Sequence, residues 1–151
     1  MFQLKLFVMK QSFKKLNPWY VTGLCDGEAT FTYSRTGLQS LVLYFALKLG
    51  EKDKSTLKEI QAFFGVGKIY PVKYSNLEKE KEKSGFYYRV TKLSELEKII
   101  EHFDRYPLRT QKAKSYQVWR EMVFLKKKNF RKPSSKELEN LAQKLATVSR
   151  W

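Results

Sequence analysis

Alternating apolar and polar residues predict four β-strands in this chain. The clearest lies in residues 40–49, where the odd-numbered positions are apolar and the even-numbered positions are mixed. The same alternation predicts a strand over residues 29–34, a third around 67–73 and a fourth around 86–91. Each strand would carry one apolar face and one face of hydroxyl, aromatic and cationic side chains. Such a sheet is expected to pack its apolar face on helices and to leave the other face open.

Apolar residues spaced three to four apart predict helices between and after these strands. One helix follows a cap at Asp53 and stops at Gly65, and a second follows a capping box formed by Ser94 and Glu97. A third begins near Thr110, and a terminal helix opens at residues 133–137. We expect the apolar residues of the first two of these helices to lie in the core: Leu57, Ile60, Phe64, Leu96, Ile99, Ile100 and Phe103. The terminal helix could dock on its own domain or on a partner chain.

The predicted order is one helix followed by two strand–strand–helix units, which is an α+β fold. A chain of 151 residues forms one domain with a sizeable core. We divide it into an N-terminal extension (1–15), a core (16–125), and a basic linker with a C-terminal helix (126–151). Residues 74–85, in which Glu and Lys alternate, predict a long hairpin loop between the third and fourth strands.

The first helix ends in two acidic residues, which is unusual. Asn17 is a good N-cap and Pro18 suits the first helical position, so the helix runs for two to three turns toward Gly27. Asp26 and Glu28 then lie near its C-terminus, where the helix dipole disfavours each anion by ~0.3–1 kcal/mol. A divalent cation, which prefers hard oxygen ligands, would remove this penalty. The alternative is that Asp26 hydrogen-bonds a nearby turn and Glu28 is solvated.

The net charge of the chain indicates which class of molecule it binds. Thirty basic residues against fifteen acidic ones give a net charge of +15, so we expect a polyanion such as nucleic acid. The single cysteine, Cys25, excludes a disulfide framework and a cysteine-based zinc cluster, and we expect it in the core. The single histidine, His102, is expected on the surface. Neither a secretory signal nor a membrane span is evident, so we expect an intracellular protein of the cytoplasm, nucleoid or an organelle matrix, not secreted and without a membrane partner.

The string Val21-Thr22-Gly23-Leu24-Cys25-Asp26-Gly27-Glu28-Ala29, between Trp19 and Phe31, resembles the signature of the LAGLIDADG homing endonucleases. It matches the variant whose second acid is Glu. Lys52-Asp53, the segment 64–67 and the segment 106–112 look like later landmarks of that family in the same order, so the resemblance spans roughly residues 16–125. It implies a single αββαββα domain with a saddle-shaped, antiparallel four-stranded sheet and, here, extra C-terminal helices.

The resemblance also implies an activity. The family cleaves both strands of a long, roughly palindromic DNA target by metal-dependent phosphodiester hydrolysis, and its members are commonly intron-encoded. Carried onto this sequence, Glu28 and the Ala29 carbonyl would hold Mg²⁺, for which Mn²⁺ can substitute. Asp26 would assist catalysis or cap the paired helix ends. Lys112 would lie beside the active site, although a solvated lysine fits its spacing equally well. Lys48 or Lys52 would replace a polar residue usual at the end of the second strand.

By the same resemblance, a chain with one copy of the signature helix implies a homodimer with two such helices packed side by side. Gly23 and Gly27, at i and i+4, allow close approach of another backbone, and each weakens a solitary helix by ~0.8–1.0 kcal/mol relative to Ala. We therefore expect Trp19, Thr22, Gly23 and Gly27 at the interface.

The mixed strand faces are expected to contact DNA, although half the faces of antiparallel sheets are simply solvated. The candidate residues are Thr32, Ser34, Ser40, Val42, Tyr44, Ala46, Lys48, Lys68, Tyr70, Tyr87, Arg89 and Thr91, together with Lys114. An intron RNA maturase or a nuclease-silent DNA- or RNA-binding protein is the alternative function. Retention of both acids favours the enzyme, because carboxylates at a polyanion interface weaken binding.

Overall fold

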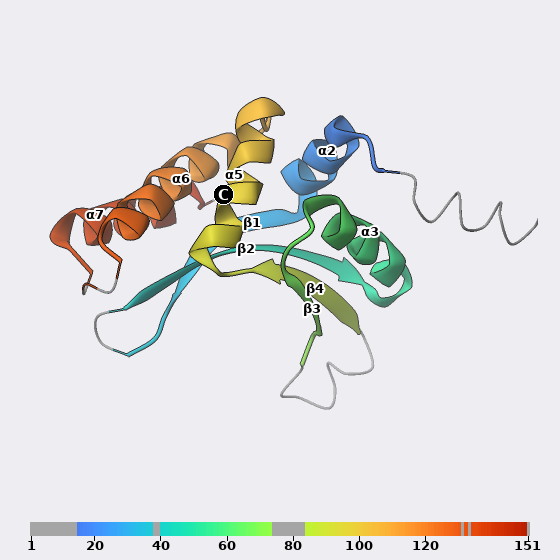
Figure 1. The fold of residues 1–151 in the computed structure, drawn as a ribbon, viewed down its shortest axis with the longest axis horizontal. Helices are drawn as coiled ribbons and strands as arrows, with labels where there is room; N and C mark the ends of the chain where they lie inside the picture. The colour runs from blue at the N-terminus through green and yellow to red at the C-terminus, as the bar shows by residue number, and fades with distance from the viewer. Residues whose placement is uncertain (1–14, 38–39, 74–83, 131, 133, 151) are drawn as a thin grey trace, which may run out of the picture.

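The structure is a computed structural model that describes residues 15–37, 40–73, 84–130, 132 and 134–150. The predicted order of one helix and two strand–strand–helix units is confirmed (Figure 1). The elements are α2 (Pro18–Glu28), β1 (Ala29–Arg35), β2 (Leu41–Gly50), the 3₁₀ turn η1 (Glu51–Asp53), α3 (Lys54–Phe64), β3 (Lys68–Pro71), β4 (Gly85–Val90), α5 (Leu93–Arg105), α6 (Lys112–Lys128) and α7 (Lys136–Val148). Residues 1–14 of the predicted N-terminal extension and most of the predicted hairpin loop lie outside the described residues.

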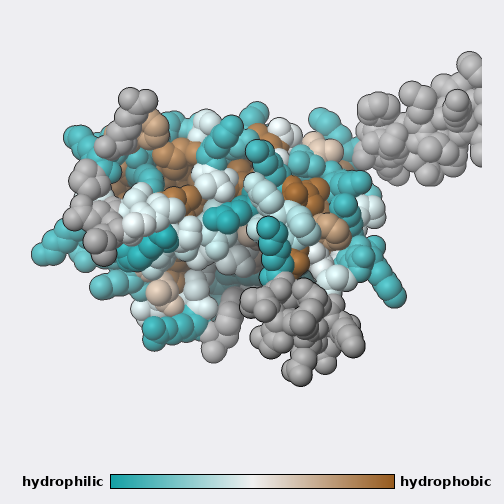
Figure 2. All heavy atoms as spheres, turned by 90° about the horizontal axis from the view of Figure 1, so that it is seen from below, coloured by the Kyte–Doolittle hydropathy of each residue, from teal (hydrophilic) through white to brown (hydrophobic). Residues whose placement is uncertain are grey.

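The four strands form one antiparallel sheet in the order β1-β2-β4-β3. The sheet arches beneath the helices, all of which lie on its convex side (Figure 1). The alternation predicted for residues 40–49 is confirmed, because Leu41, Leu43, Phe45 and Leu47 are fully or almost fully buried against the helices. Seen from the helix-free side, hydrophilic and intermediate side chains predominate over the sheet, with smaller hydrophobic patches among them (Figure 2).

Phe31 of β1 lies at the centre of an aromatic cluster that joins the sheet to α5 and α6. Its ring centroid is 5.2–5.4 Å from those of Phe45, Phe103, Tyr116 and Trp119. The Trp119 indole also donates a hydrogen bond from Nε1 to the Thr32 carbonyl at 3.1 Å. Burying aromatic rings in such tilted and edge-on contacts adds ~0.5–1.5 kcal/mol per pair beyond the area term. This cluster therefore fixes α6 on β1.

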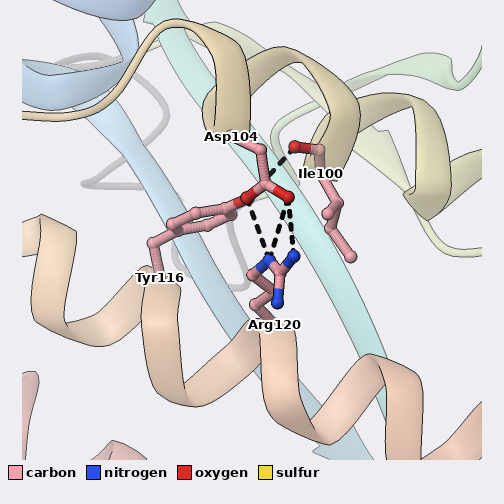
Figure 3. A network of polar contacts seen from close by, with 4 residues as sticks. All are labelled: Ile100, Asp104, Tyr116 and Arg120. Carbon is pink, nitrogen blue, oxygen red and sulfur yellow. Dashed lines mark hydrogen bonds and ion pairs between the residues drawn. The ribbon is translucent and has the colours of Figure 1, made fainter.

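A polar network holds α6 against α5 (Figure 3). The Asp104 carboxylate accepts from Arg120 Nε at 2.9 Å and from Arg120 Nη2 at 2.7 Å, and the Tyr116 hydroxyl donates to Asp104 at 2.6 Å. The same hydroxyl is 3.1 Å from the Ile100 carbonyl. Burial alone would raise the pKa of Asp104, but the hydrogen bonds from Arg120 and Tyr116 lower it below its usual value. The network sets the position of α6, whose first residue is Lys112.

Two predicted boundaries are wrong. Helix α5 begins at Leu93 with Lys92 at the N-cap, so Ser94 lies inside the first turn and does not form the predicted capping box. Helix α6 continues to Lys128, so the first three residues of the predicted basic linker are helical. Lysines in a last helical turn are favoured because they oppose the negative end of the helix dipole. By contrast, the predicted stop at Gly65 is confirmed, since it adopts a left-handed conformation at the end of α3.

The C-terminal helix α7 docks on its own domain. Ser135 caps it by accepting from the Leu138 amide at 3.1 Å, and Leu138, Ala142 and Leu145 are buried against the rest of the chain. Glu139 of α7 pairs with Arg35 at the end of β1 through two hydrogen bonds of 2.9 and 3.1 Å. Within the described part of the chain, no helix combines the length and the apolar character needed to cross a bilayer.

Candidate active site at the end of helix α2

Helix α2 places its two acidic residues, Asp26 and Glu28, at the edge of the sheet. Asn17 caps the helix as predicted, accepting from the Trp19 amide through Oδ1 at 2.9 Å, and Pro18 occupies the first helical position. Val21 and Cys25 are completely buried in the core, which fixes the rotation of the helix. Because the helix ends at Glu28 and β1 begins at Ala29, the chain changes direction immediately after the acids.

The Asp26 carboxylate accepts several hydrogen bonds from its own chain. Its carboxylate accepts from the backbone amides of Arg109, at 3.0 Å, and Thr110, at 3.2 Å, and from the Thr110 hydroxyl at 2.6 Å. Burial alone would raise the pKa of Asp26, but these hydrogen bonds and the nearby Lys112 lower it below its usual value. Asp26 thus positions the segment that leads into α6. A direct part for Asp26 in catalysis remains a prediction.

Lys112 is buried, so the alternative of a solvated lysine is wrong. Its Nζ donates to the Cys25 carbonyl in the last turn of α2, at 3.3 Å. Burial lowers the pKa of Lys112, while the negative charges of Asp26 and Glu28 act in the opposite direction. A cation at the C-terminal end of a helix opposes the negative end of its dipole. Lys112 therefore explains how α2 tolerates two acids at its last turn.

Glu28 differs from Asp26 in that its carboxylate accepts no hydrogen bond from the described part of the chain. Its side chain is exposed, and within the described residues it makes no hydrogen bond or ion pair. The positive charge of Lys112 acts on it from nearby. Glu28 is thus a carboxylate available to a ligand.

The Ala29 carbonyl is the second predicted metal ligand at this edge, although Ala29 as a whole is only 2% exposed. The Thr36 amide donates to the Ser40 carbonyl at 3.0 Å, and bonded pairs alternate along an antiparallel ladder, so Ala29 occupies a non-bonded position opposite Leu47. Its amide instead donates to the Cys25 carbonyl. The amide and carbonyl of a strand residue point the same way, so the Ala29 carbonyl turns from β2 toward the free edge of the sheet.

These two oxygens fit a divalent cation such as Mg²⁺, which prefers carboxylate and carbonyl ligands and keeps several waters. Among the described residues there is no group of three or more His, Cys, Asp or Glu side chains able to hold a metal ion. One chain therefore contributes a partial ligand set, and the remaining positions would be filled by water, by phosphate oxygens or by a second carboxylate.

The structure corrects the predictions for Thr22 and His102. Thr22 is buried: its hydroxyl donates to the Tyr106 carbonyl at 2.8 Å and lies 3.0 Å from His102 Nε2, so the histidine donates to it. Thr22 thus faces α5 and not a partner chain. His102 was expected on the surface, but it is buried and only 8% exposed. Helical spacing could have predicted this burial, because His102 follows Ile99 by three residues on the apolar stripe of α5.

Stability is expected to depend on the protonation of His102. Burial lowers its pKa to about 4, below the usual value of 6.5. Between these values the unfolded chain binds a proton that the folded chain does not, so stability is present above pH 6.5 and is lost as the pH falls. From pH 6.5 to pH 5 we expect the free energy of unfolding to decrease by ~2 kcal/mol. Chemical denaturation at both pH values should show this decrease in the wild type but not in His102→Gln. An equal decrease in the two proteins would contradict the prediction.

The exposed side of α2 carries the other predicted interface residues. Trp19 is 56% exposed and packs edge-on against Tyr106, with ring centroids 5.1 Å apart. Gly23 and Gly27 are exposed, and a Cβ atom added at either would meet no atom within 4 Å. This face therefore combines small residues with an exposed aromatic side chain. Their predicted role at an interface remains a prediction.

The strand register places most predicted DNA-contacting residues together on the helix-free face of the sheet, which is the face seen in Figure 2. Ser40 immediately precedes β2 and Thr91 immediately follows β4. Lys114 is separate, because α6 covers the opposite face. The structure adds contacts that the sequence could not reveal: the Arg89 guanidinium lies 3.8 Å from the Tyr44 ring centroid, and Tyr70 stacks on Tyr87 at 5.3 Å.

Comparison with known proteins agrees with this geometry. Residues 21–123 match the model of the LAGLIDADG endonuclease family. The chain is 30% identical over 128 residues to "Probable intron-encoded endonuclease 3" of Neurospora crassa, covering 80% of this chain but only 22% of that protein. It superposes on the LAGLIDADG meganuclease I-AabMI bound to uncleaved DNA with a TM-score of 0.73 and 31% identity, covering 89% of this chain and 45% of that one. The homing endonuclease I-TnaI shares the fold, with a TM-score of 0.66 at 19% identity, and is covered over 99% of its length. The match of the family model over more than half of the sequence means that this chain belongs to the LAGLIDADG endonuclease family.

Proposed function

We propose that the chain acts as a site-specific homing endonuclease, intron-encoded like the Neurospora crassa protein to which it is similar. Two copies would cleave both strands of a long, roughly palindromic DNA target by metal-dependent hydrolysis. The observation that carries the proposal is the exposed carboxylate of Glu28, which makes no hydrogen bond or ion pair with the described residues and lies next to Ala29 and near the charge of buried Lys112. A carboxylate with no partner in a chain of charge +15 is otherwise unfavourable for binding a polyanion.

Each residue at the end of α2 has a distinct part in this proposal. Glu28 and the Ala29 carbonyl would hold Mg²⁺, or Mn²⁺ in its place, at the scissile phosphate. A divalent cation there lowers the pKa of a bound water and stabilises charge on the phosphate oxygens. Lys112 adds a fixed positive charge beside Glu28, and Asp26 keeps Lys112 in place by holding the preceding turn. The positive charge beside Glu28 is thus held in place by contacts made elsewhere in the fold.

The proposal requires two copies of this site, one for each strand. The glycine face of α2 would meet the same face of a second chain about a two-fold axis, which brings two Glu28 carboxylates to the centre of the target. Two chains of +15 give a dimer of +30, which attracts DNA at long range. A two-fold symmetric protein reads a roughly palindromic site.

The test is selection from a partly randomised palindromic duplex library with the purified protein in Mg²⁺, and in Ca²⁺ as a control ion with looser coordination geometry. Double-strand cuts at a defined sequence in Mg²⁺ would support the proposal and identify the target. Sequence enrichment by binding without cuts in Mg²⁺ would favour a nuclease-silent DNA-binding protein. Binding of intron RNA in preference to any duplex would favour a maturase.

Arg89 is expected to read a guanine. Its guanidinium lies over the Tyr44 ring, 3.8 Å from the ring centroid, and its Nε is buried without a hydrogen-bond partner in the described structure, which leaves the two Nη groups as donors. A forked arginine pairing with guanine O6 and N7 is the commonest specific contact in the major groove and contributes ~1–3 kcal/mol of discrimination. Arg89→Ala should therefore lose base preference at one position in each half-site in the same selection.

The control for Arg89→Ala is Arg150→Ala, an equal change of charge beyond the end of α7. It should weaken binding slightly and leave the preferred sequence unchanged. If the preferred sequence of Arg89→Ala matched that of the wild type at every position, Arg89 would contact backbone only.

A further inference from the structure

A basic groove runs outside the helix-free face, between α3 and the free edge of β3. Its volume is about 600 Å³, and the described residues that line it include Lys54, Lys58 and Lys68 but no acidic residue. Strand β3 is the last strand of the sheet on this side. The groove therefore borders the surface proposed for base contacts and shares Lys68 and Tyr70 with it, whereas Lys54 and Lys58 lie outside that surface.

Two side chains on α3 are held in place at this groove. Lys54 Nζ lies 4.4 Å from the centre of the Phe86 ring, a cation–π contact, and Gln61 donates from Nε2 to the Gly67 carbonyl at 2.9 Å. Lys58 follows Lys54 by one helical turn, so both lysines project from the same side of α3. An ordered lysine loses less side-chain freedom when it binds an anion.

The strand edge adds a backbone donor. Val72 donates to the Gly85 carbonyl at 2.9 Å, and because bonded pairs alternate, Ile69 occupies a non-bonded position opposite Tyr88. The Ile69 amide thus points toward the open edge that the groove follows. Pro71, the next residue on that edge, has no amide hydrogen, which prevents a regular ladder with another strand. Cations and an interrupted edge suit an anion better than a β-strand of a partner protein.

We propose that this groove binds the phosphodiester backbone of the DNA duplex whose major groove lies on the sheet. The inference rests on the function proposed above. Four strands spaced ~4.8 Å apart are about as wide as a major groove of ~12 Å, so the phosphate backbones run along the sheet edges. At the β3 edge one backbone meets Lys54, Lys58 and the Ile69 amide. These contacts add affinity and fix register without selecting bases.

The test compares salt dependence of DNA binding for the wild type and Lys54→Gln/Lys58→Gln, measured in Ca²⁺ on the selected target. Each phosphate contact contributes ~0.9 to the slope of log affinity against log salt concentration. We expect the double variant to lower the slope by ~1–2, with an unchanged preferred sequence. The matched control is Lys136→Gln/Lys144→Gln on α7, which changes the net charge equally far from the groove.

The outcomes separate the two proposals. If the wild type binds no duplex, the proposed function fails. If the wild type binds but the groove variant has the slope of the α7 control, the duplex backbone does not occupy the groove and this inference is overturned. A changed base preference in the groove variant would likewise overturn it, because backbone contacts carry no direct sequence information.

Discussion

Replacing Glu28 with Gln is expected to reduce DNA cleavage in Mg²⁺ by ~10²–10⁴-fold, because a metal ligand supports several kcal/mol of charge stabilisation at the scissile phosphate. The amide keeps the size of the side chain and removes the negative charge that a cation requires. Since Glu28 is exposed and unpartnered within the described structure, the substitution should leave the free energy of unfolding nearly unchanged. The measurement is single-turnover cleavage of the selected duplex.

Binding gives the second half of this test. The variant removes one negative charge per chain from a surface that faces DNA, so its affinity for the target should equal or exceed that of the wild type. Glu101→Gln is the matched control, because Glu101 is exposed on α5 and distant in sequence from the site. It should cleave like the wild type. Wild-type cleavage rates for Glu28→Gln would remove Glu28 from the catalytic site and with it the proposed metal centre.

The sequence predicted the features that are set by local patterns. Alternation over residues 40–49 assigned the buried and open faces of β2, because neighbouring side chains of a strand point to opposite faces. Asn17 and Pro18 located the start of α2 because capping depends on residues next to one another. The position of Glu28 at the end of that helix follows from the same local rules.

The sequence could not predict contacts between distant segments. Asp26 binds Thr110, 84 residues away, and Thr22 binds His102, 80 residues away. Both pairs form only when α5 and the segment before α6 pack against α2. The acids of α2 looked unfavourable because the compensating cation, Lys112, comes from another helix. Lysines 126–128 suggested a linker because a charged run resembles both a solvated loop and the favoured last turn of a helix.

Replacing both Gly23 and Gly27 with Gln is expected to separate folding from dimer formation. Neither glycine has a positive φ, and an added Cβ would meet no atom within 4 Å, so the single chain has room for both side chains. Helix propensity then favours the variant by several tenths of a kcal/mol per site, since Gly is ~0.8–1.0 kcal/mol less favourable than Ala in a helix and Gln is close to Ala. The same side chains would prevent two helix backbones from approaching closely. We therefore expect the variant to be at least as stable as the wild type.

The expected loss is in assembly and in cleavage. Sedimentation velocity should show a dimer for the wild type and a monomer for Gly23→Gln/Gly27→Gln, and double-strand cleavage should disappear with the dimer, because one chain supplies one Glu28. Ala146→Gln, an exposed small residue on α7, should change neither. A dimeric variant would show that the α2 face is not the interface. A monomeric wild type that still cuts both strands would show that one chain acts on each strand in turn. The glycine pair thus distinguishes a requirement for close helix contact from a role of these residues within the single chain.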